Sequence, residues 1–355
     1  MPRFLPSLLP LLALAALPGA HAAPPADPLA AVDALMRDYQ GRVPGASVLV
    51  LRDGQAVVRR GYGMADLEAG TPAGPRTHYR LASITKQFTA AAILLLAEDG
   101  RLTLDDPVKR WLPSLPAAAD GVRLRHLLAH TSGVVDYEDA LPPGLDRQLR
   151  DADVLRILEG QDRTYFPPGS AYRYSNSGYA LLALVVGRAS GTDFARFLRE
   201  RIFLPLGMAH TRAHQAGVDV VPDRAYGYSE VDGVWTRTDQ SPTSAVLGDG
   251  GIYSSIDDLA RWDAALYDGR LLRPESLARM FAPAAATDEP DVPHYGFGWR
   301  LNGDSVWHSG ESIGFRNVLV RWPKERLTVV VLTNRDDPEP YRLALEIAHL
   351  FRAPR

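Results

Sequence analysis

The sequence predicts an α+β fold in which an antiparallel sheet, flanked by terminal helices, is built from both ends of the chain and a helical lobe is inserted between them. Strand-like runs lie near both termini, and helical patterns fill the middle of the chain. Because each element must bury its apolar face against another layer, this order favours two lobes with a cleft between them. We expect the α/β lobe to comprise about residues 27–80 and 250–355, and the all-helical lobe about residues 100–245.

The composition is that of a globular protein. The 355 residues are 46% hydrophobic and 23% charged, and the net charge of −3 gives no electrostatic reason to expect nucleic acid as a partner. The chain has no cysteine, which excludes disulfides, thiolate nucleophiles and cysteine-ligated metals. We therefore expect any chemistry to come from oxygen and nitrogen side chains.

The N-terminus has the pattern of a secretory signal peptide. Arg3 precedes an apolar run over residues 8–17, and Ala20-His21-Ala22 offers a cleavage site of the A-x-A type. Prolines interrupt the run, which is too short to span a bilayer. We expect a signal peptide over residues 1–22, a single catalytic domain over residues 23–355 without an integral membrane segment, and a periplasmic or secreted location.

The first elements follow from local signals. Asp27-Pro28 is typical of a helix N-terminus, and the apolar spacing from Leu29 to Tyr39 indicates one buried stripe. Two strand-like runs, residues 46–51 and 55–60, flank Asp53-Gly54, a hairpin signal because glycine readily adopts the positive φ of a tight turn.

The remaining elements are read from periodicity. Residues 283–293 are expected to be an ordinary loop. Helical patterns cover residues 87–98, 122–130, 152–158, 176–189, 193–202, 256–266 and 274–281. Short strands are expected at residues 295–300, 306–308, 317–322 and 327–332, before a closing helix at 339–351.

A serine and a lysine three residues apart are the first candidates for chemistry. Only three of the 39 Lys and Arg residues are lysines, and one of them is Lys86, which follows Ser83 by three positions. A buried lysine can lose its proton whereas arginine does not, so a general base must be lysine rather than arginine. If Ser83 opens a helix, both side chains lie on one face, one turn apart. A capping serine with a surface lysine is the alternative interpretation.

Two further motifs accompany this pair. Tyr174-Ser175-Asn176 precedes an apolar helix, and His308-Ser309-Gly310 lies on a C-terminal strand. In order and spacing, the three motifs resemble the serine beta-lactamase and penicillin-binding-protein superfamily. Tyrosine in the second motif is similar to the branch of class C beta-lactamases, D-alanyl-D-alanine carboxypeptidases and family VIII esterases. His130-Thr131-Ser132-Gly133 and the run at residues 248–254 also resemble this branch.

The resemblance implies a beta-lactamase/transpeptidase-like fold and a serine mechanism without metal. Ser83 would attack an acyl carbon, and its proton would pass to Lys86 or Tyr174, between which the sequence does not decide. The backbone N–H groups of Ser83 and Glu311 would form the oxyanion hole, as family geometry implies. Asn176 would hydrogen-bond Lys86 and a substrate amide.

The third motif departs from the commonest Lys-Thr-Gly. His308 and Ser309, followed by Gly310, resemble the third motif of certain D,D-peptidases and D-amino-acid amidases. The resemblance implies D-amino-acid peptides, amides or simple esters as substrates ahead of beta-lactams, including peptides of the cell wall, with at most weak beta-lactamase activity and no cofactor. The reference pKa of an imidazole is about 6.5. We therefore expect His308 to make activity or specificity change across neutral pH.

Two other functions stay open. A penicillin-binding sensor or scaffold that acylates with little turnover would have the same motifs. Residues 310–314 also match the G-x-S-x-G pattern, which would make Ser312 the nucleophile of an esterase, although the Val-rich segment after it favours strands over the required helix. The histidine pairs His126/His130 and His210/His214 are spaced as metal ligands, but we interpret the first as packing and capping and the second as surface residues.

Overall fold

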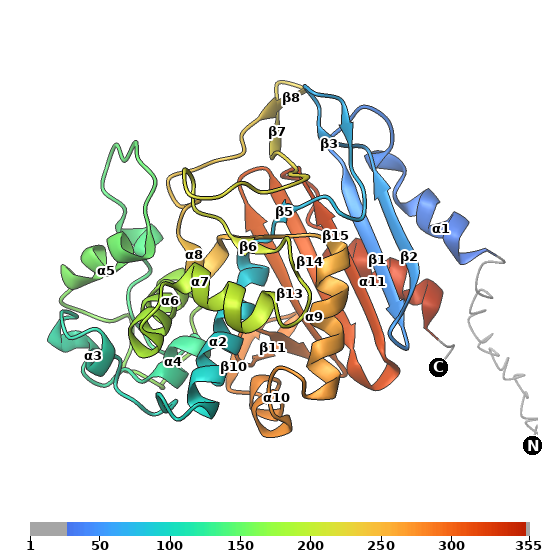
Figure 1. Cartoon of the computed structure of the whole chain (residues 1–355). Helices are drawn as coiled ribbons and strands as arrows, with labels where there is room; N and C mark the ends of the chain where they lie inside the picture. The colour runs from blue at the N-terminus through green and yellow to red at the C-terminus, as the bar shows by residue number, and fades with distance from the viewer. Residues whose placement is uncertain (1–26, 353–355) are drawn as a thin grey trace, which may run out of the picture.

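A computed structural model describes residues 27–352 of the chain (Figure 1). The predicted signal peptide at residues 1–22 lies outside the described residues. The main sheet has eight strands in the order β10-β11-β12-β13-β14-β15-β1-β2, and all its pairings are antiparallel. The predicted α+β class, with terminal helices against an antiparallel sheet, is confirmed.

The N-terminal and C-terminal parts of the described chain are paired in this sheet. Strand β1 (Ala46–Arg52) pairs with β15 (Leu327–Thr333) over its whole length, and with β2 (Gln55–Tyr62) through the predicted hairpin. Asp53 and Gly54 have φ of 53° and 79°, as the tight turn requires. Strands β13 (Ser305–Ser312) and β14 (Phe315–Trp322) form a second long hairpin beside β15.

Helices cover both faces of the sheet (Figure 1). Helices α1 (Pro28–Leu35) and α11 (Tyr341–Phe351) share a hydrophobic cluster with Val48 and Val50 of β1. Leu49 and Leu51 point to the opposite face, where they join the larger core with α9 (Ile256–Asp268). This alternation of buried residues along β1 is the period of two expected for a strand covered on both sides.

The larger core continues into the helical lobe around the buried helix α2, which packs against α6. Residues 86–96 of α2 are all buried, so its first turn is held rigidly between the lobes. The helices of this part are α2 (Lys86–Glu98), α3 (Val108–Trp111), α4 (Leu124–Leu128), α5 (Asp151–Glu159), α6 (Asn176–Ser190), α7 (Phe194–Leu198) and α8 (Leu247–Gly250).

The region expected to be all-helical also contains strands. Strands β7 (Tyr228–Val231) and β8 (Val234–Arg237) form a hairpin whose turn, Asp232-Gly233, has positive φ at both residues. The turn is the same local signal as Asp53-Gly54. The short strand β6 (Arg212–Ala213) joins β5 (Tyr79–Arg80) and β9 (Ile252–Ser254) in a small three-stranded sheet, and β3 (Met64–Asp66) pairs with β4 (Thr71–Pro72).

Two predictions near the C-terminal strands were wrong. Residues 283–293 are not only a loop, because they contain β10 (Ala285–Glu289) and the start of β11 (Val292–Tyr295). The expected strand at 295–300 is instead a turn before β12 (Arg300–Asn302). Gly298 in this turn has φ of 77°, and a Cβ there would lie 2.7 Å from the Lys86 carbonyl oxygen. The turn is thus shaped by close contact with α2. Helix α10 (Pro274–Met280) precedes it as predicted.

Candidate active site

Ser83 lies in a tight turn at the start of α2. The turn is a 3₁₀ segment, Ala82–Thr85, which leads directly into the α-helix, so the helix expected to open at Ser83 begins as a tighter turn. The Leu81 N–H donates to the Ile252 carbonyl over 2.8 Å and ties the turn to β9. Ser83 itself is partly exposed. The Ser83 hydroxyl is therefore accessible to a substrate, while the turn that carries it is fixed to β9.

Lys86 is fully buried, and its ammonium group makes three hydrogen bonds. Its Nζ donates to Ser83 Oγ over 3.0 Å, to Asn176 Oδ1 over 2.7 Å and to the Asp249 carbonyl oxygen over 3.0 Å. These acceptors come from the 3₁₀ turn before α2, from α6 and from α8, so three elements fix one nitrogen. The structure thus brings Ser83, Lys86 and Asn176 together, and excludes the interpretation of Lys86 as a surface residue.

Tyr174 lies beside this nitrogen, just before α6. Lys86 Nζ is 4.9 Å from the centroid of the Tyr174 ring and 5.6 Å from that of Tyr179. On its other side the Tyr174 ring lies 4.3 Å from the His130 ring and 6.2 Å from the His308 ring. The Tyr174 side chain therefore lies among residues of the other predicted motifs, beside Lys86, His130 and His308.

Asp136 holds the start of α6 and was missed in the sequence. Its Oδ2 accepts the N–H of Asn176 over 2.6 Å and that of Ser177 over 3.4 Å, while Oδ1 accepts the N–H of Glu138 over 3.1 Å. A carboxylate at a helix N-terminus satisfies free N–H groups and interacts favourably with the helix dipole. Its partners lie forty residues away, so no local pattern indicates this role.

His126 and His130 have structural roles, as expected from the sequence: each is packed in the fold and accepts a hydrogen bond from a backbone N–H group. His126 Nδ1 accepts the N–H of Arg123 at the start of α4 over 3.2 Å. His130 Nδ1 accepts the N–H of Ser175 over 3.1 Å, and its carbonyl oxygen accepts the N–H of Arg173 over 3.0 Å. Among residues 27–352, no group of three or more His, Cys, Asp or Glu side chains could hold a metal ion.

His308 is fully buried rather than exposed to the cleft. Its Nδ1 lies 2.6 Å from the Ser309 carbonyl oxygen and its Nε2 lies 2.9 Å from the Tyr295 hydroxyl. A neutral ring satisfies both contacts, because Nδ1–H donates to the carbonyl while the phenol donates to Nε2. Burial, with the nearby Arg300 and Lys86 cations, lowers the pKa of His308 well below its usual range. The expectation that His308 titrates across neutral pH was wrong.

Ser309 and Gly310 contact different groups. Arg300 Nη1 donates to Ser309 Oγ over 3.3 Å. A Cβ on Gly310 would lie 2.0 Å from the Leu81 carbonyl oxygen and 3.3 Å from the Ser83 nitrogen. Only glycine allows β13 to approach the Ser83 turn so closely. The close approach places the backbone of the third motif next to the predicted nucleophile.

A small cavity of about 50 Å³ opens above Ser83. Its lining includes the predicted Asn176 and Glu311, whereas Lys86, Tyr174, His308 and Ser309 do not line it. The other lining residues are Arg80, Ala82, Tyr137, Glu138, Thr243, Ser244, Asp249, Gly250 and Ser312. Ser312 lies at the end of β13, and β14 follows it after a two-residue turn. The strand–turn–helix arrangement that a G-x-S-x-G nucleophile requires is therefore absent at this position.

Carboxyl groups surround Lys86 without forming an ion pair with it. The Asp249 side chain accepts a hydrogen bond from the Tyr137 hydroxyl over 3.0 Å, and burial raises its pKa well above the usual range. Burial and the neighbouring Asp136 also raise the pKa of Glu138. Burial thus disfavours the charged form of both carboxyl groups, although the Lys86 cation opposes this rise in the pKa of each.

The comparison with known proteins decides the family. The family described as Beta-lactamase matches residues 30–353, nearly the whole chain. The chain belongs to the beta-lactamase family. This beta-lactamase-family protein is a serine hydrolase of the superfamily that includes the penicillin-binding proteins.

Similar proteins of this family have different names. Penicillin-binding protein 4* of Bacillus subtilis (strain 168) is 33% identical over 84% of this chain and 70% of its own length. D-aminopeptidase of Gluconobacter oxydans (strain 621H) is 32% identical over 86% of this chain, which spans only 58% of that relative. D-amino acid amidase from Ochrobactrum anthropi SV3, complexed with L-phenylalanine amide, superposes with a TM-score of 0.79 and 28% identity, covering 92% of this chain and all of its own.

Proposed function

We propose that this protein hydrolyses amide or ester bonds through an acyl-enzyme on Ser83, with D-amino-acid amides or peptides and simple esters as substrates. The observation that carries the proposal is the contact of Lys86 Nζ with both Ser83 Oγ and Asn176 Oδ1. A nucleophile in direct contact with a potential base, which is oriented by a third group, is the arrangement that activates a serine.

The reaction then has two steps. Ser83 Oγ forms a bond to the substrate carbonyl carbon, and its proton passes through Lys86 or Tyr174 to the leaving amine or alcohol as the carbon–nitrogen or carbon–oxygen bond breaks. Water then cleaves the acyl-enzyme, releasing a carboxylic acid and returning the proton to Ser83. The backbone N–H groups of Ser83 and Glu311 are proposed to stabilise the oxyanion in both steps.

One carboxyl at the cavity supports amino-acid substrates. Arg80, Glu138 and Glu311 all line the cavity, and Glu311 lies 3.8 Å from Arg316. Glu138 has no ion pair among residues 27–352, so its carboxyl group is the one that could interact with the ammonium group of a substrate. The names of D-aminopeptidase and D-amino acid amidase among the similar proteins support the same substrate class.

Two serines offer a direct test. Ser83→Ala and Ser312→Ala are compared for hydrolysis of D-alanine p-nitroanilide, p-nitrophenyl butyrate and nitrocefin. We expect Ser83→Ala to lower kcat/KM by at least about 10³-fold and Ser312→Ala to retain most activity. The reverse result would establish the alternative esterase and overturn the proposal.

Mass spectrometry separates a hydrolase from a penicillin-binding sensor or scaffold. After incubation with benzylpenicillin or p-nitrophenyl butyrate, we expect the unmodified mass to return once the substrate is exhausted. An adduct on Ser83 that persists for hours with every substrate would instead indicate a sensor that acylates but does not turn over.

We also propose export of the protein to the periplasm or medium, where cell-wall peptides are available as substrates. The proposal is supported by the charged start, apolar run and Ala20-His21-Ala22 of the sequence. No helix among residues 27–352 is long and apolar enough to span a bilayer. Fractionation of expressing cells, with N-terminal analysis of the product, should find a chain beginning at Ala23 outside the cytoplasm; a chain retained in the cytoplasm with Met1 would contradict this.

A further inference from the structure

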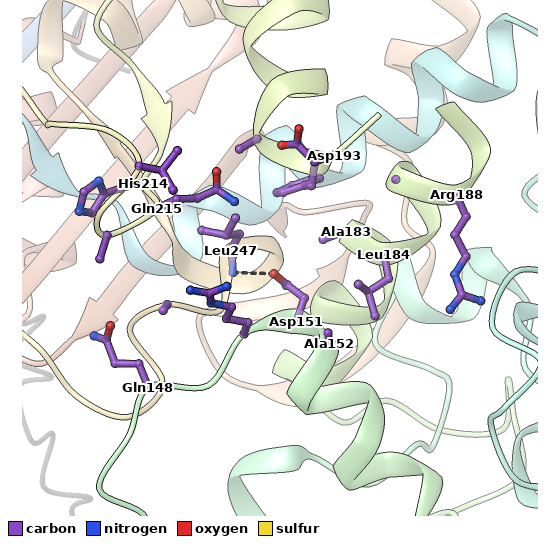
Figure 2. Close-up of a pocket in the computed structure, with 17 residues that line it drawn as sticks. Gln148, Asp151, Ala152, Ala183, Leu184, Arg188, Asp193, His214, Gln215 and Leu247 are labelled. Atoms are coloured by element: carbon purple, nitrogen blue, oxygen red, sulfur yellow. Dashed lines mark hydrogen bonds between the residues drawn. The ribbon is translucent and has the colours of Figure 1, made fainter. Parts of the chain in front are cut away.

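A second cavity lies in the helical lobe, away from Ser83. It has a volume of about 430 Å³, within the range of about 300–1,000 Å³ typical of small-molecule sites. Its walls come from α5, α6, the start of α7 and the segment at residues 214–218 (Figure 2). No residue lines both this cavity and the one at Ser83. We refer to it as the lobe cavity.

The walls of the lobe cavity are largely apolar, with charged groups among them. Leu184, Phe194 and Leu247 provide apolar surface. The charged and titratable side chains are Arg150, Asp151, Arg188, Asp193 and His214.

Most of these polar groups already have partners. Arg188 donates to the Trp111 carbonyl oxygen, and Figure 2 shows its guanidinium directed away from the other labelled residues. Asp193 caps α7 by accepting the N–H of Arg196, and His214 contacts the Asp219 carboxylate. In the part of the chain that the structure describes, Arg150 has no ion pair.

Asp151 connects the lobe cavity to α8. Its carboxylate is buried and accepts the N–H of Leu247 over 3.1 Å and that of Gly248 over 2.9 Å; the first bond is drawn in Figure 2. Burial raises the pKa of Asp151 to about 6, and the two N–H groups oppose this rise. Asp151 is thus a buried acid with backbone partners and, among residues 27–352, without an ion pair.

Helix α8 connects this wall to the catalytic lysine. It is a single turn, so Leu247, which faces the lobe cavity, is only two residues from Asp249, whose carbonyl oxygen accepts from Lys86 Nζ. Between them the Gly248 carbonyl accepts from Thr89 Oγ1 over 2.7 Å, and a Cβ on Gly248 would lie 2.2 Å from the Tyr179 carbonyl oxygen. The single turn of α8 therefore contacts the lobe cavity at Leu247 and Lys86 at Asp249.

We propose that the lobe cavity is a regulatory site for a small carboxylate with an apolar body, and that its occupation slows the reaction at Ser83 by shifting α8. The carboxylate would pair with Arg150, and the apolar body would contact Leu184, Phe194 and Leu247. The inference rests on the proposed function in one respect: hydrolysis of any ester or amide releases a carboxylic acid, so a ligand of this class is a product of the reaction.

Phenylacetate tests the proposal, with phenylacetamide as its uncharged counterpart. We expect phenylacetate to lower kcat for p-nitrophenyl butyrate by about fivefold to a plateau, with KM little changed, because the two sites are occupied together. Phenylacetamide should reach half of the plateau inhibition only at a concentration about tenfold higher than phenylacetate, since it lacks the charge that pairs with Arg150. Purely competitive inhibition by phenylacetate would place the ligand at Ser83 and overturn the proposal.

Variants locate the binding site independently of Ser83. Leu184→Trp fills the lobe cavity, so it should lower kcat towards the inhibited plateau by itself and leave no further response to phenylacetate. Arg150→Met removes the unpaired charge, so it should abolish the plateau inhibition while retaining basal activity. Arg199→Met, an exposed arginine that does not line the cavity, is the matched control and should behave as wild type. If Leu184→Trp does not fold, Arg150→Met still decides.

Calorimetry separates this proposal from the proposed function. Phenylacetate should bind Ser83→Ala as it binds wild type, even if the nucleophile proves to be another residue. Inhibition that survives in both Leu184→Trp and Arg150→Met would exclude the lobe cavity, whatever the outcome at Ser83.

Discussion

His130 holds Tyr174 from three directions. The centroids of the two rings are 4.3 Å apart. The His130 carbonyl accepts the N–H of Arg173, and its Nδ1 accepts the N–H of Ser175, so both chain neighbours of Tyr174 are bonded to one residue. Burial lowers the pKa of His130 well below its usual range, which keeps the ring neutral and Nδ1 able to accept. His130 is therefore a positioning residue for the phenol.

Substitution of His130 should affect turnover more than binding. His130 has φ of 58°, a conformation that asparagine tolerates, and an asparagine Oδ1 can still accept the Ser175 N–H. We expect His130→Asn to lower kcat about tenfold and His130→Ala about 100-fold, with KM changed less than about threefold. Steady-state kinetics with p-nitrophenyl butyrate measures both parameters.

His126→Ala is the matched control, because His126 makes the same kind of bond to a backbone N–H without contacting Tyr174. It should lower the melting temperature without a comparable loss of kcat. If His130→Ala lost stability but kept its kcat, the positioning role would be refuted.

Lys86 should not tolerate arginine. Its Nζ has three acceptors within 3.0 Å in a fully buried site, and the larger planar guanidinium cannot reproduce this geometry or readily give up a proton. We expect Lys86→Arg to lower kcat/KM by at least about 10³-fold. Lys109→Arg, which changes a partly exposed lysine paired with Asp120, should have wild-type kinetics. Substantial activity in Lys86→Arg would rule out a proton-transfer role for the lysine.

The sequence was sufficient to predict the parts of the active site that depend on the spacing of residues close together in the chain. Ser83 and Lys86 are one helical turn apart whatever surrounds them, and Tyr174 and Asn176 share one loop-to-helix corner. Strands β1, β2, β14 and β15 of the main sheet were also recognisable, as apolar runs with a clear turn signal at Asp53-Gly54 between the first two.

What the sequence did not reveal depends on contacts between distant segments. The N–H group of Asn176 that donates to Asp136 lies forty residues further along the chain, and the turn at Gly298 packs closely against the backbone of Lys86. His308 has an ordinary reference pKa, but the folded chain buries it against Tyr295 and near two cations. Burial and neighbouring charge are properties of the tertiary structure, so the titration of His308 was predicted wrongly.

Asp136 should support both stability and catalysis. Asp136→Asn keeps the shape of the side chain but removes the charge that interacts with the N-terminus of α6, where Asn176 begins the helix. We expect a loss of about 1 kcal/mol in the free energy of unfolding and a fall of about tenfold in kcat. Denaturant unfolding and steady-state kinetics measure the two effects.

Asp193→Asn provides the comparison, because Asp193 caps α7 in a similar way and does not contact the motif residues. It should lower stability by a similar amount and leave kcat unchanged. Equal kinetic losses in the two variants would show that the effect of Asp136 is general destabilisation.

Three buried histidines should make the fold acid-sensitive. Burial lowers the pKa values of His130 and His308 well below the usual range and that of His78 to about 4. In the unfolded chain these histidines bind protons below about pH 6.5, whereas in the folded protein they stay neutral to a lower pH. Their contribution to the free energy of unfolding is therefore fully present above about pH 6.5 and is lost as the pH falls towards the pKa values of the folded state. The free energy of unfolding should decrease from pH 7 to pH 5 by at most about 2 kcal/mol per histidine.

His78 isolates this effect from the active site. Both its ring nitrogens are buried without a hydrogen-bond partner among residues 27–352, and the charges acting on it are those of Asp258, Asp223, His210 and Arg212. His78→Gln removes the titrating ring, so the difference in unfolding free energy between pH 7 and pH 5 should shrink by about 2 kcal/mol. His294→Gln, at an exposed position, should leave that difference unchanged. An unaltered pH dependence in His78→Gln would mean that His78 is accessible to protons in the folded protein.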